Sequence, residues 1–232
     1  NFSEDAVVGR NNTDLANDLG NLVQRAAAII AKNFDGKVPA LPADRDPSEM
    51  VKTAIALGQF LVSGDESLRE ATNTPQVSPI RETLDELKLH VTLADIMLLV
   101  QRLNQVMASD QPFKSVKTDP DAAAVTMYHV LEGIRFAANL LWPAMPRKCE
   151  TILTRVGWDG GVRKLAELRW GDLKSGAVLV TGDPLFPRHK LPSDIAKEGE
   201  KAAKQAAKVK AREPVAGDGQ IDFETFTTVD LR

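Results

Sequence analysis

The chain has 232 residues, of which 43% are hydrophobic and 5% aromatic. This length can bury one sizeable core, and an apolar content dominated by Ala, Leu and Val favours helices over β-sandwiches. The net charge of −3 argues against a uniformly basic nucleic-acid-binding protein, so any RNA binding must come from a local patch. The single cysteine, Cys149, excludes an intrachain disulfide and a thiolate metal cluster, and it fits a reducing compartment.

The sequence shows no membrane or secretory signal. Its longest apolar run, Ile96 to Val100, is far too short to span a bilayer. The chain begins at Asn1 without a leader peptide and stops at Arg232 in what resembles the start of a strand. We therefore expect a piece of a longer, cytoplasmic protein that has no membrane partner.

The stretch from Thr13 to Lys32 predicts a helix with two distinct faces, capped at Asn12, Thr13 or Asp14. Asn17, Asn21 and Arg25 recur every fourth residue on one face. Amide and guanidinium groups suit the hydrogen-bonding edges of bases, although an ordinary solvated face carries such residues too. The other face is a stripe for the core, made of Leu15, Leu19, Leu22, Ala26, Ile29 and Ile30.

Periodicity and proline positions predict four more helices, separated by loops such as Gly64 to Pro79. The first of these follows Asp46, with Pro47 as its first residue. The others begin at Ile80, at Asp119-Pro120 and at about Arg147. Their expected inward residues are Met50, Ala54, Leu57, Phe60 and Leu61; Leu89, Leu93, Ile96, Leu99, Leu103 and Val106; Met127, Leu131, Ile134, Ala138 and Leu141; and Cys149, Ile152, Leu153 and Val156. The predicted fold is all-α, a bundle of about five helices over residues 1–157.

The amino-acid composition changes after the bundle. Glycines punctuate short apolar runs in residues 158–192, which predicts an extended, hairpin-like tail packed on the bundle. Residues 193–220 are rich in Ala and Lys, with six basic and two acidic residues between Ala196 and Arg212. This pattern predicts a solvated helical linker whose positive charge can also reach phosphates.

No motif for catalysis is present, and His129, in the fourth predicted helix, is interpreted as a partly buried structural histidine. A second candidate binding stretch follows the third helix. Pro112 should end that helix and place Phe113 in a turn, where an exposed ring can stack on a base. Lys117 lies close enough in sequence to neutralise a nearby phosphate. The alternative is that Phe113 closes the end of the bundle as a core residue.

The amino-acid sequences of several stretches resemble those of one protein family. Asp14 to Leu22 with Arg25, then Asn33 to Pro39, is similar to the start of the anticodon-binding domain of bacterial methionyl-tRNA synthetases. A later family stretch is matched at Asn104, Pro112, Lys117 and Asp119, with Val106 in place of a Tyr and Phe113 in place of a Trp. Trp142 to Gly157, Pro184 to Arg188 and Ile221 to Arg232 extend the resemblance in the family's order. The last of these, residues 221–232, resembles the first strand of a truncated OB-type tRNA-binding domain.

The resemblance implies recognition of the anticodon loop of methionine tRNA as part of a methionine–tRNA ligase. Asn21 and Arg25 map onto family residues that contact the anticodon bases, and Asn17 shares their face. Phe113 takes the stacking role, Pro112 fixes its exit from the helix, and Lys117 is a weaker candidate for a backbone contact.

The catalytic chemistry of this family resides in a separate domain of the same polypeptide, whose His-Ile-Gly-His and Lys-Met-Ser-Lys-Ser signatures are missing here. We therefore expect a catalytically inactive, monomeric fragment without a cofactor or metal of its own. The parent enzyme would use ATP with magnesium, and the resemblance leaves open zinc in its catalytic half and dimerisation through the C-terminal domain. Two alternatives remain: the bundle of another class I synthetase, for leucine, isoleucine, valine or cysteine, and a non-catalytic helical protein-interaction module.

Overall fold

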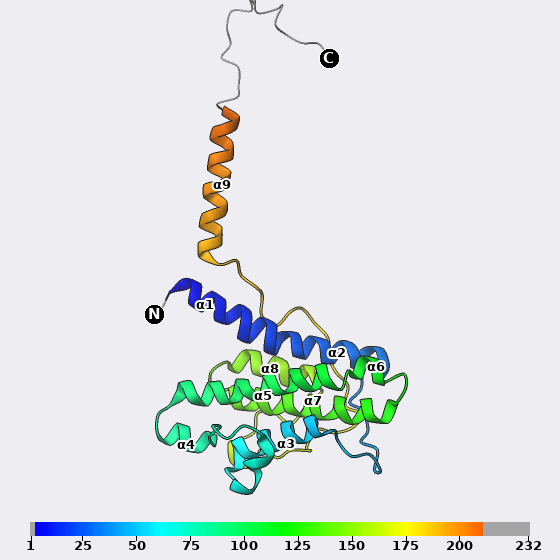
Figure 1. Ribbon diagram of the computed structural model, residues 1–232. Coiled ribbons are helices and arrows are strands. Elements are labelled where there is room, and N and C mark those ends of the chain that lie inside the picture. Colours follow the sequence, from blue (N-terminus) through cyan, green and yellow to red (C-terminus); the bar gives the residue numbers. More distant parts are fainter. Residues whose placement is uncertain (1–2, 211–232) are drawn as a thin grey trace, which may run out of the picture. The chain divides into compact units, whose positions relative to one another are not determined.

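A computed structural model describes residues 3–210 of the chain (Figure 1). Residues 10–188 form one compact unit, and residues 3–9 with 189–210 belong to a second. The elements in chain order are α1 (Glu4–Arg10), the π-helix η1 (Asn11–Gly20), α2 (Asn21–Asn33), α3 (Glu49–Ser63), the 3-10 turns η2 (Glu66–Leu68) and η3 (Glu70–Thr72), α4 (Ile80–Asp85), α5 (Leu89–Ser109), α6 (Pro112–Ser115), α7 (Pro120–Leu141), α8 (Pro146–Arg155), the 3-10 turn η4 (Leu165–Glu167) and α9 (Pro192–Lys210).

The all-α prediction is confirmed. The described residues contain no strand, and their one β-bridge is an isolated antiparallel pair between Lys37 and Val178. Helix α7 lies at the centre of the larger unit, where it packs against α2, α3, α5 and α8. It is buried along nearly its whole length, so the other helices surround it rather than forming a layer beside it.

The first predicted helix exists, but its start and its hydrogen bonding differ from the prediction. Leu19, Leu22, Ala26 and Ile30 are buried as expected, and the remaining stripe residues are partly buried. A cap at residues 12–14 is wrong, because helical structure already begins at Glu4. The ten residues before Asn21 form a π-helix, in which backbone N–H groups bond to carbonyls five residues earlier.

The caps of the next helices follow from local side-chain chemistry. Ser48, rather than a proline, caps α3: its hydroxyl accepts a hydrogen bond from Val51 N at 3.2 Å. The prediction that Pro47 is the first helical residue is therefore wrong. For α7 the prediction is confirmed, since Asp119 accepts from Ala122 N at 3.0 Å and Pro120 is the first residue of the helix.

The third predicted helix is broken in two. Leu87 adopts a left-handed conformation with φ of +56°, which separates α4 from α5. Leu89 is 60% exposed and Leu93 is also exposed, so the predicted buried stripe holds only from Ile96 onward. The predicted loop from Gly64 to Pro79 contains two 3-10 turns, η2 and η3.

The segment after α8 is extended, and its ladder-like backbone hydrogen bonds are made with the loop after α2. Val38 N donates to Ala177 O at 2.8 Å, and Gly176 N donates to Val38 O at the same distance. Four leucines of this segment are buried in the same core as the helices: Leu168, Leu173, Leu179 and Leu185. The domain boundary expected after residue 157 stays a prediction.

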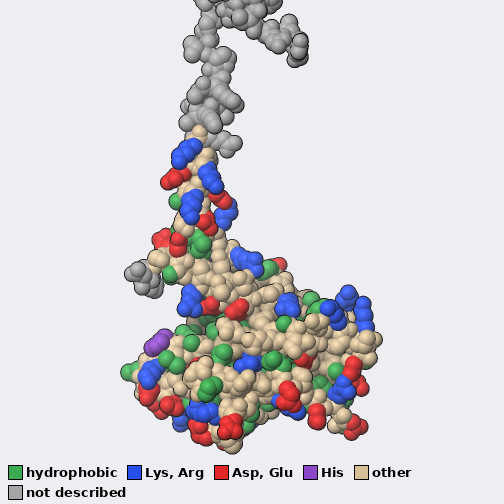
Figure 2. Space-filling model, in the orientation of Figure 1, with side chains coloured by type: hydrophobic (Ala, Val, Ile, Leu, Met, Phe, Trp, Pro, Cys, Tyr) green, Lys and Arg blue, Asp and Glu red, His purple; other side chains and the backbone are tan. Residues whose placement is uncertain are grey.

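In the smaller unit α9 is helical, as the linker prediction requires, and Lys190 pairs with Glu198 at 2.7 Å. Figure 2 shows basic and acidic side chains interspersed along this helix. The rest of the predicted linker, residues 211–220, and the predicted OB-type strand, residues 221–232, lie outside the described residues.

Candidate nucleic-acid interface

Helix α2 presents an amide and a guanidinium one turn apart. Asn21 is its first residue and is exposed, and Arg25 follows four residues later and is half-buried. Within residues 3–210 neither side chain has a hydrogen-bond or ion-pair partner. Their donors and acceptors are therefore available to a ligand.

Asn17 differs from these two residues, although it lies one turn earlier. Its side-chain oxygen accepts a hydrogen bond from the guanidinium of Arg188, in the segment after α8. The side chain is exposed, and its NH₂ group remains able to donate. Asn17 thus joins the face of α2 to the Pro184–Arg188 stretch that the sequence singled out separately.

Phe113 lies on a short helix, so the prediction of a simple turn is wrong. Gln111 takes a left-handed conformation with φ of +45°, and Pro112 then starts α6 and is buried. Phe113 comes next and keeps 44% of its surface exposed. The Lys114 ammonium lies 5.6 Å from the centre of its ring, and Lys117 is exposed two residues after α6 ends. A ring face beside one ammonium group, with a second lysine nearby in the chain, suits a base with its phosphate.

The topology places these groups toward one end of the bundle. In Figure 1, η1 with α2 and α5 run in the same direction, and Asn104 of α5 donates to Asp18 O of η1 at 3.1 Å. Arg25 follows Asp18 by seven residues along η1 and α2, and Pro112 follows Asn104 by eight residues along α5 and the turn after it. At the helical rise, Arg25 lies roughly 10 Å ahead of this contact, and α5 ends at Ser109 roughly 8 Å ahead of it, just before Pro112. Figure 2 shows several basic side chains gathered over this end.

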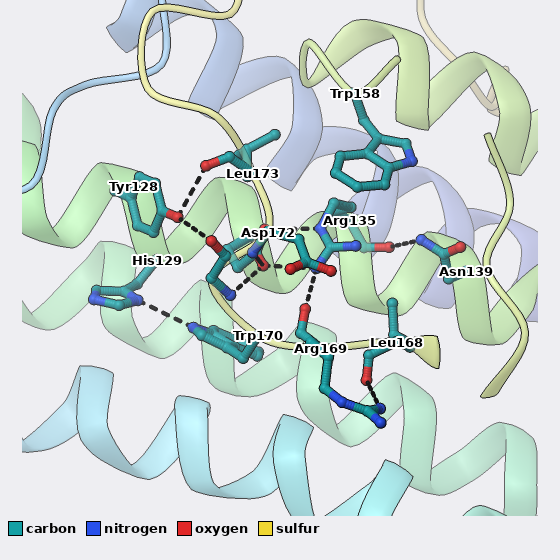
Figure 3. Close-up of polar contacts among 12 residues, drawn as sticks. Tyr128, His129, Arg135, Asn139, Trp158, Leu168, Arg169, Trp170, Asp172 and Leu173 are labelled. Atoms are coloured by element: carbon teal, nitrogen blue, oxygen red, sulfur yellow. Dashed lines mark hydrogen bonds and ion pairs between the residues drawn. The ribbon is translucent and has the colours of Figure 1, made fainter. Parts of the chain in front are cut away.

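Sequence reasoning missed a buried polar cluster on the central helix (Figure 3). Glu132 and Arg135 are both fully buried and are paired by two hydrogen bonds of 2.8 and 2.7 Å. Glu132 also accepts from the backbone N–H groups of Gly171 and Asp172, at 2.6 and 3.0 Å. The cluster thereby fixes the loop after Leu168 on α7. Its only signal in the sequence is an acid and a base three residues apart inside an apolar stretch.

The adjoining aromatic residues complete this cluster and are structural (Figure 3). Trp170 donates from Nε1 to Nδ1 of His129 at 3.1 Å, and burial lowers the pKa of His129 to about 4. The imidazole is therefore neutral at pH 7, and its partial burial and bond to Trp170 agree with the structural interpretation of His129. Tyr128 donates to the carbonyls of Gly171 and Leu173, and burial raises the pKa of its phenol to about 12.

The described part of the chain has neither a cluster of metal-ligating side chains nor a membrane-spanning helix. No group of three or more His, Cys, Asp or Glu side chains in it could hold a metal ion. None of its helices is long and apolar enough to cross a membrane.

Similar proteins share both the sequence and the fold. The chain is 31% identical over 188 residues to the methionine–tRNA ligase of Brucella suis biovar 1 and 32% identical over 199 residues to that of Lactiplantibacillus plantarum. These alignments cover 81% and 84% of this chain but 33% and 27% of the relatives. The ligase of Halalkalibacterium halodurans aligns over all of this chain at 29% identity.

Among solved structures, free Mycobacterium tuberculosis methionyl-tRNA synthetase matches with a TM-score of 0.68 and 30% identity, over 82% of this chain and 36% of that one. The same enzyme in complex with methionyl-adenylate gives a TM-score of 0.67. No family model matches the chain. The chain spans about a third of the length of the curated relatives it matches. In sequence and in fold alike, it is a relative of the bacterial methionyl-tRNA synthetases.

Proposed function

We propose that this chain recognises the anticodon loop of methionine tRNA on behalf of a methionine–tRNA ligase. The observation that carries the proposal is the pair Asn21 and Arg25, which has no polar partner within residues 3–210 and lies toward the same end of the bundle as the exposed Phe113. Bases of a tRNA loop can be splayed from the stack, and side chains of this kind can then reach their edges.

Each group has a distinct task in this proposal. Arg25 donates to base acceptors through its planar fork, and Asn21 offers a donor and an acceptor. Phe113 supplies a surface on which one base stacks, and Pro112 fixes where that ring emerges. Lys117 attracts the phosphate backbone without reading sequence. Asn17 contributes through its NH₂ group, since its oxygen is already bonded to Arg188.

The activity of a full-length member is part of the same proposal. Such a protein would join methionine to tRNA, the reaction that the name of the relatives describes, with ATP and magnesium serving a catalytic domain elsewhere in the polypeptide. The 232-residue chain alone would be a monomer, which light scattering can test.

The test compares two stem-loops, one with the methionine anticodon and one with an altered anticodon, at a single low salt concentration. Wild-type chain should prefer the methionine loop, and Arg25→Ala should remove most of that preference. Arg81→Ala is the matched control, because Arg81 is an exposed arginine of α4. Helix α4 leads into the start of α5, whereas Phe113 follows the end of α5. Equal binding of both loops by wild-type protein would reduce the interaction to phosphate attraction and overturn the proposal.

A further inference from the structure

The junction between η1 and α2 coincides with the first residue proposed to read RNA. Gly20 ends the π-helix and Asn21 begins the α-helix, both with ordinary helical dihedral angles. The backbone N–H of Asn21 bonds to Ala16 O, five residues earlier, and also to Asp18 O. Because a π-helix turns less per residue than an α-helix, its length sets the direction in which the side chains of α2 point.

Asn104 of α5 bonds to the same carbonyl oxygen as Asn21. Its side-chain NH₂ group donates to Asp18 O at 3.1 Å and to Val100 O, on its own helix, at 3.2 Å. The half-buried Asn104 amide thus bridges Val100 O of α5 and Asp18 O, which also accepts from the first residue of α2. Within residues 3–210, Asn104 is the one side chain that donates to Asp18 O.

The opposite side of η1 is held by the segment after α8. A Cβ on Gly20 would lie 3.2 Å from Cδ2 of Phe186 and 3.1 Å from Leu15 O, so the packing there is close. Asn11 donates to Pro187 O at 3.1 Å, and Arg188 donates to Asn17. Asn104 adds a polar anchor between η1 and α5, where the Gln101 side chain also bonds to the Asp18 carboxyl.

We propose that Asn104 is a positioning residue for RNA recognition, which acts by holding the π-helix in the register that aims Asn21 and Arg25 at the tRNA loop. The inference rests on the proposed function, and Asn104 itself touches no RNA. Without the NH₂ group of Asn104, Asp18 O keeps only backbone donors such as Asn21 N. The start of α2 can then rotate or revert to α-helical bonding.

The experiment is a mutant cycle that measures affinity for the methionine-anticodon stem-loop at fixed salt. Asn104→Ala and the isosteric Asn104→Leu are each made in wild-type protein and in an Asn21→Ala/Arg25→Ala background. Gln105→Leu, at the next and exposed amide of α5, is the matched control. A thermal unfolding curve of each variant checks that it is folded at the temperature of the binding measurement.

Both Asn104 variants should weaken binding by about five-fold in wild-type protein, in the range expected for losing one hydrogen bond, and Gln105→Leu should not. In the Asn21→Ala/Arg25→Ala background, neither Asn104 variant should weaken binding further. An equal loss in both backgrounds would show that Asn104 acts independently of α2 and would overturn the inference. Full affinity of both Asn104 variants would overturn it as well, and the proposed function would stand if Arg25→Ala still lost discrimination. If Arg25→Ala keeps its discrimination, the proposed function itself is wrong.

Discussion

Glu132 and Arg135 form an ion pair on α7 in which neither side chain reaches solvent. A buried pair of this kind contributes little net stability over an apolar pair, but the loss of one partner leaves an unpaired charge in the core. Glu132→Gln preserves the shape of the side chain and removes its charge. We expect it to lower the free energy of unfolding by about 3–5 kcal/mol, measured by urea denaturation.

The double variant Glu132→Leu/Arg135→Met separates charge from packing. Since it removes both charges, it should be less destabilised than Glu132→Gln, although the N–H groups of Gly171 and Asp172 lose their acceptor. A double variant as unstable as the single one would show that anchoring the loop, rather than pairing charge, is the main role of Glu132.

Gly58 of α3 permits the close approach of Trp170. A Cβ at this position would lie 2.5 Å from Cζ3 and 3.0 Å from Cε3 of the indole. Gly58→Ala should therefore displace Trp170 and cost about 1–3 kcal/mol, despite the better helix propensity of Ala. Gly199→Ala in α9, where no atom lies within 4 Å of the added group, should be neutral or stabilising in the same denaturation assay.

His129 should make the stability depend on pH in the acid range. Its pKa is about 4 in the folded protein, below the unfolded value near 6.5, so the unfolded chain binds the extra proton first. Stability should fall as pH drops from 6.5 to 4, by on the order of 2 kcal/mol from this residue. Denaturation curves across this range should show a smaller fall for His129→Gln than for wild type, and an equal fall in both would show that His129 does not carry the pH dependence.

Phe113 should affect RNA binding without affecting stability. Because nearly half of its surface is exposed, Phe113→Ala should leave the thermal midpoint within about a degree while weakening stem-loop binding by about 1–3 kcal/mol, the value of one stacked base. Phe113→Trp should strengthen binding, since an indole offers a larger π-face. A large fall in the thermal midpoint of Phe113→Ala would instead identify the ring as a core residue.

The sequence predicted the parts of this fold that depend on local periodicity. The stripes of α2, α3, α7 and α8 were identified because their apolar residues face a single core, and Asp119-Pro120 was a sufficient cap signal. The break at Leu87 was missed because leucine rarely takes a positive φ and gives no turn signal. The π-helix was missed because its spacing of apolar residues resembles that of an α-helix.

The candidate site was predictable in part for the same reason. The i, i+4 spacing of Asn21 and Arg25 is local, whereas the bond between Asn17 and Arg188 joins residues 171 positions apart. Asn104 matched a family stretch without an assigned role, and its contact with Asp18, 86 positions away, is what suggests one. Glu132 and Arg135 were missed because nothing in the sequence shows that residues 169–172 cover them.

The pairing of residues 36–38 with residues 176–179 has a consequence for folding during synthesis. Lys37 and Val178 are 141 positions apart, and Leu179 N donates to Gly36 O at 2.9 Å across the same junction. The helices can begin to associate as they leave the ribosome, but the core lacks Leu168, Leu173, Leu179 and Leu185 until translation has passed them. A nascent chain that stalls between α8 and Arg188 would therefore expose an unfinished apolar surface, so a chaperone should bind this intermediate in preference to the completed unit.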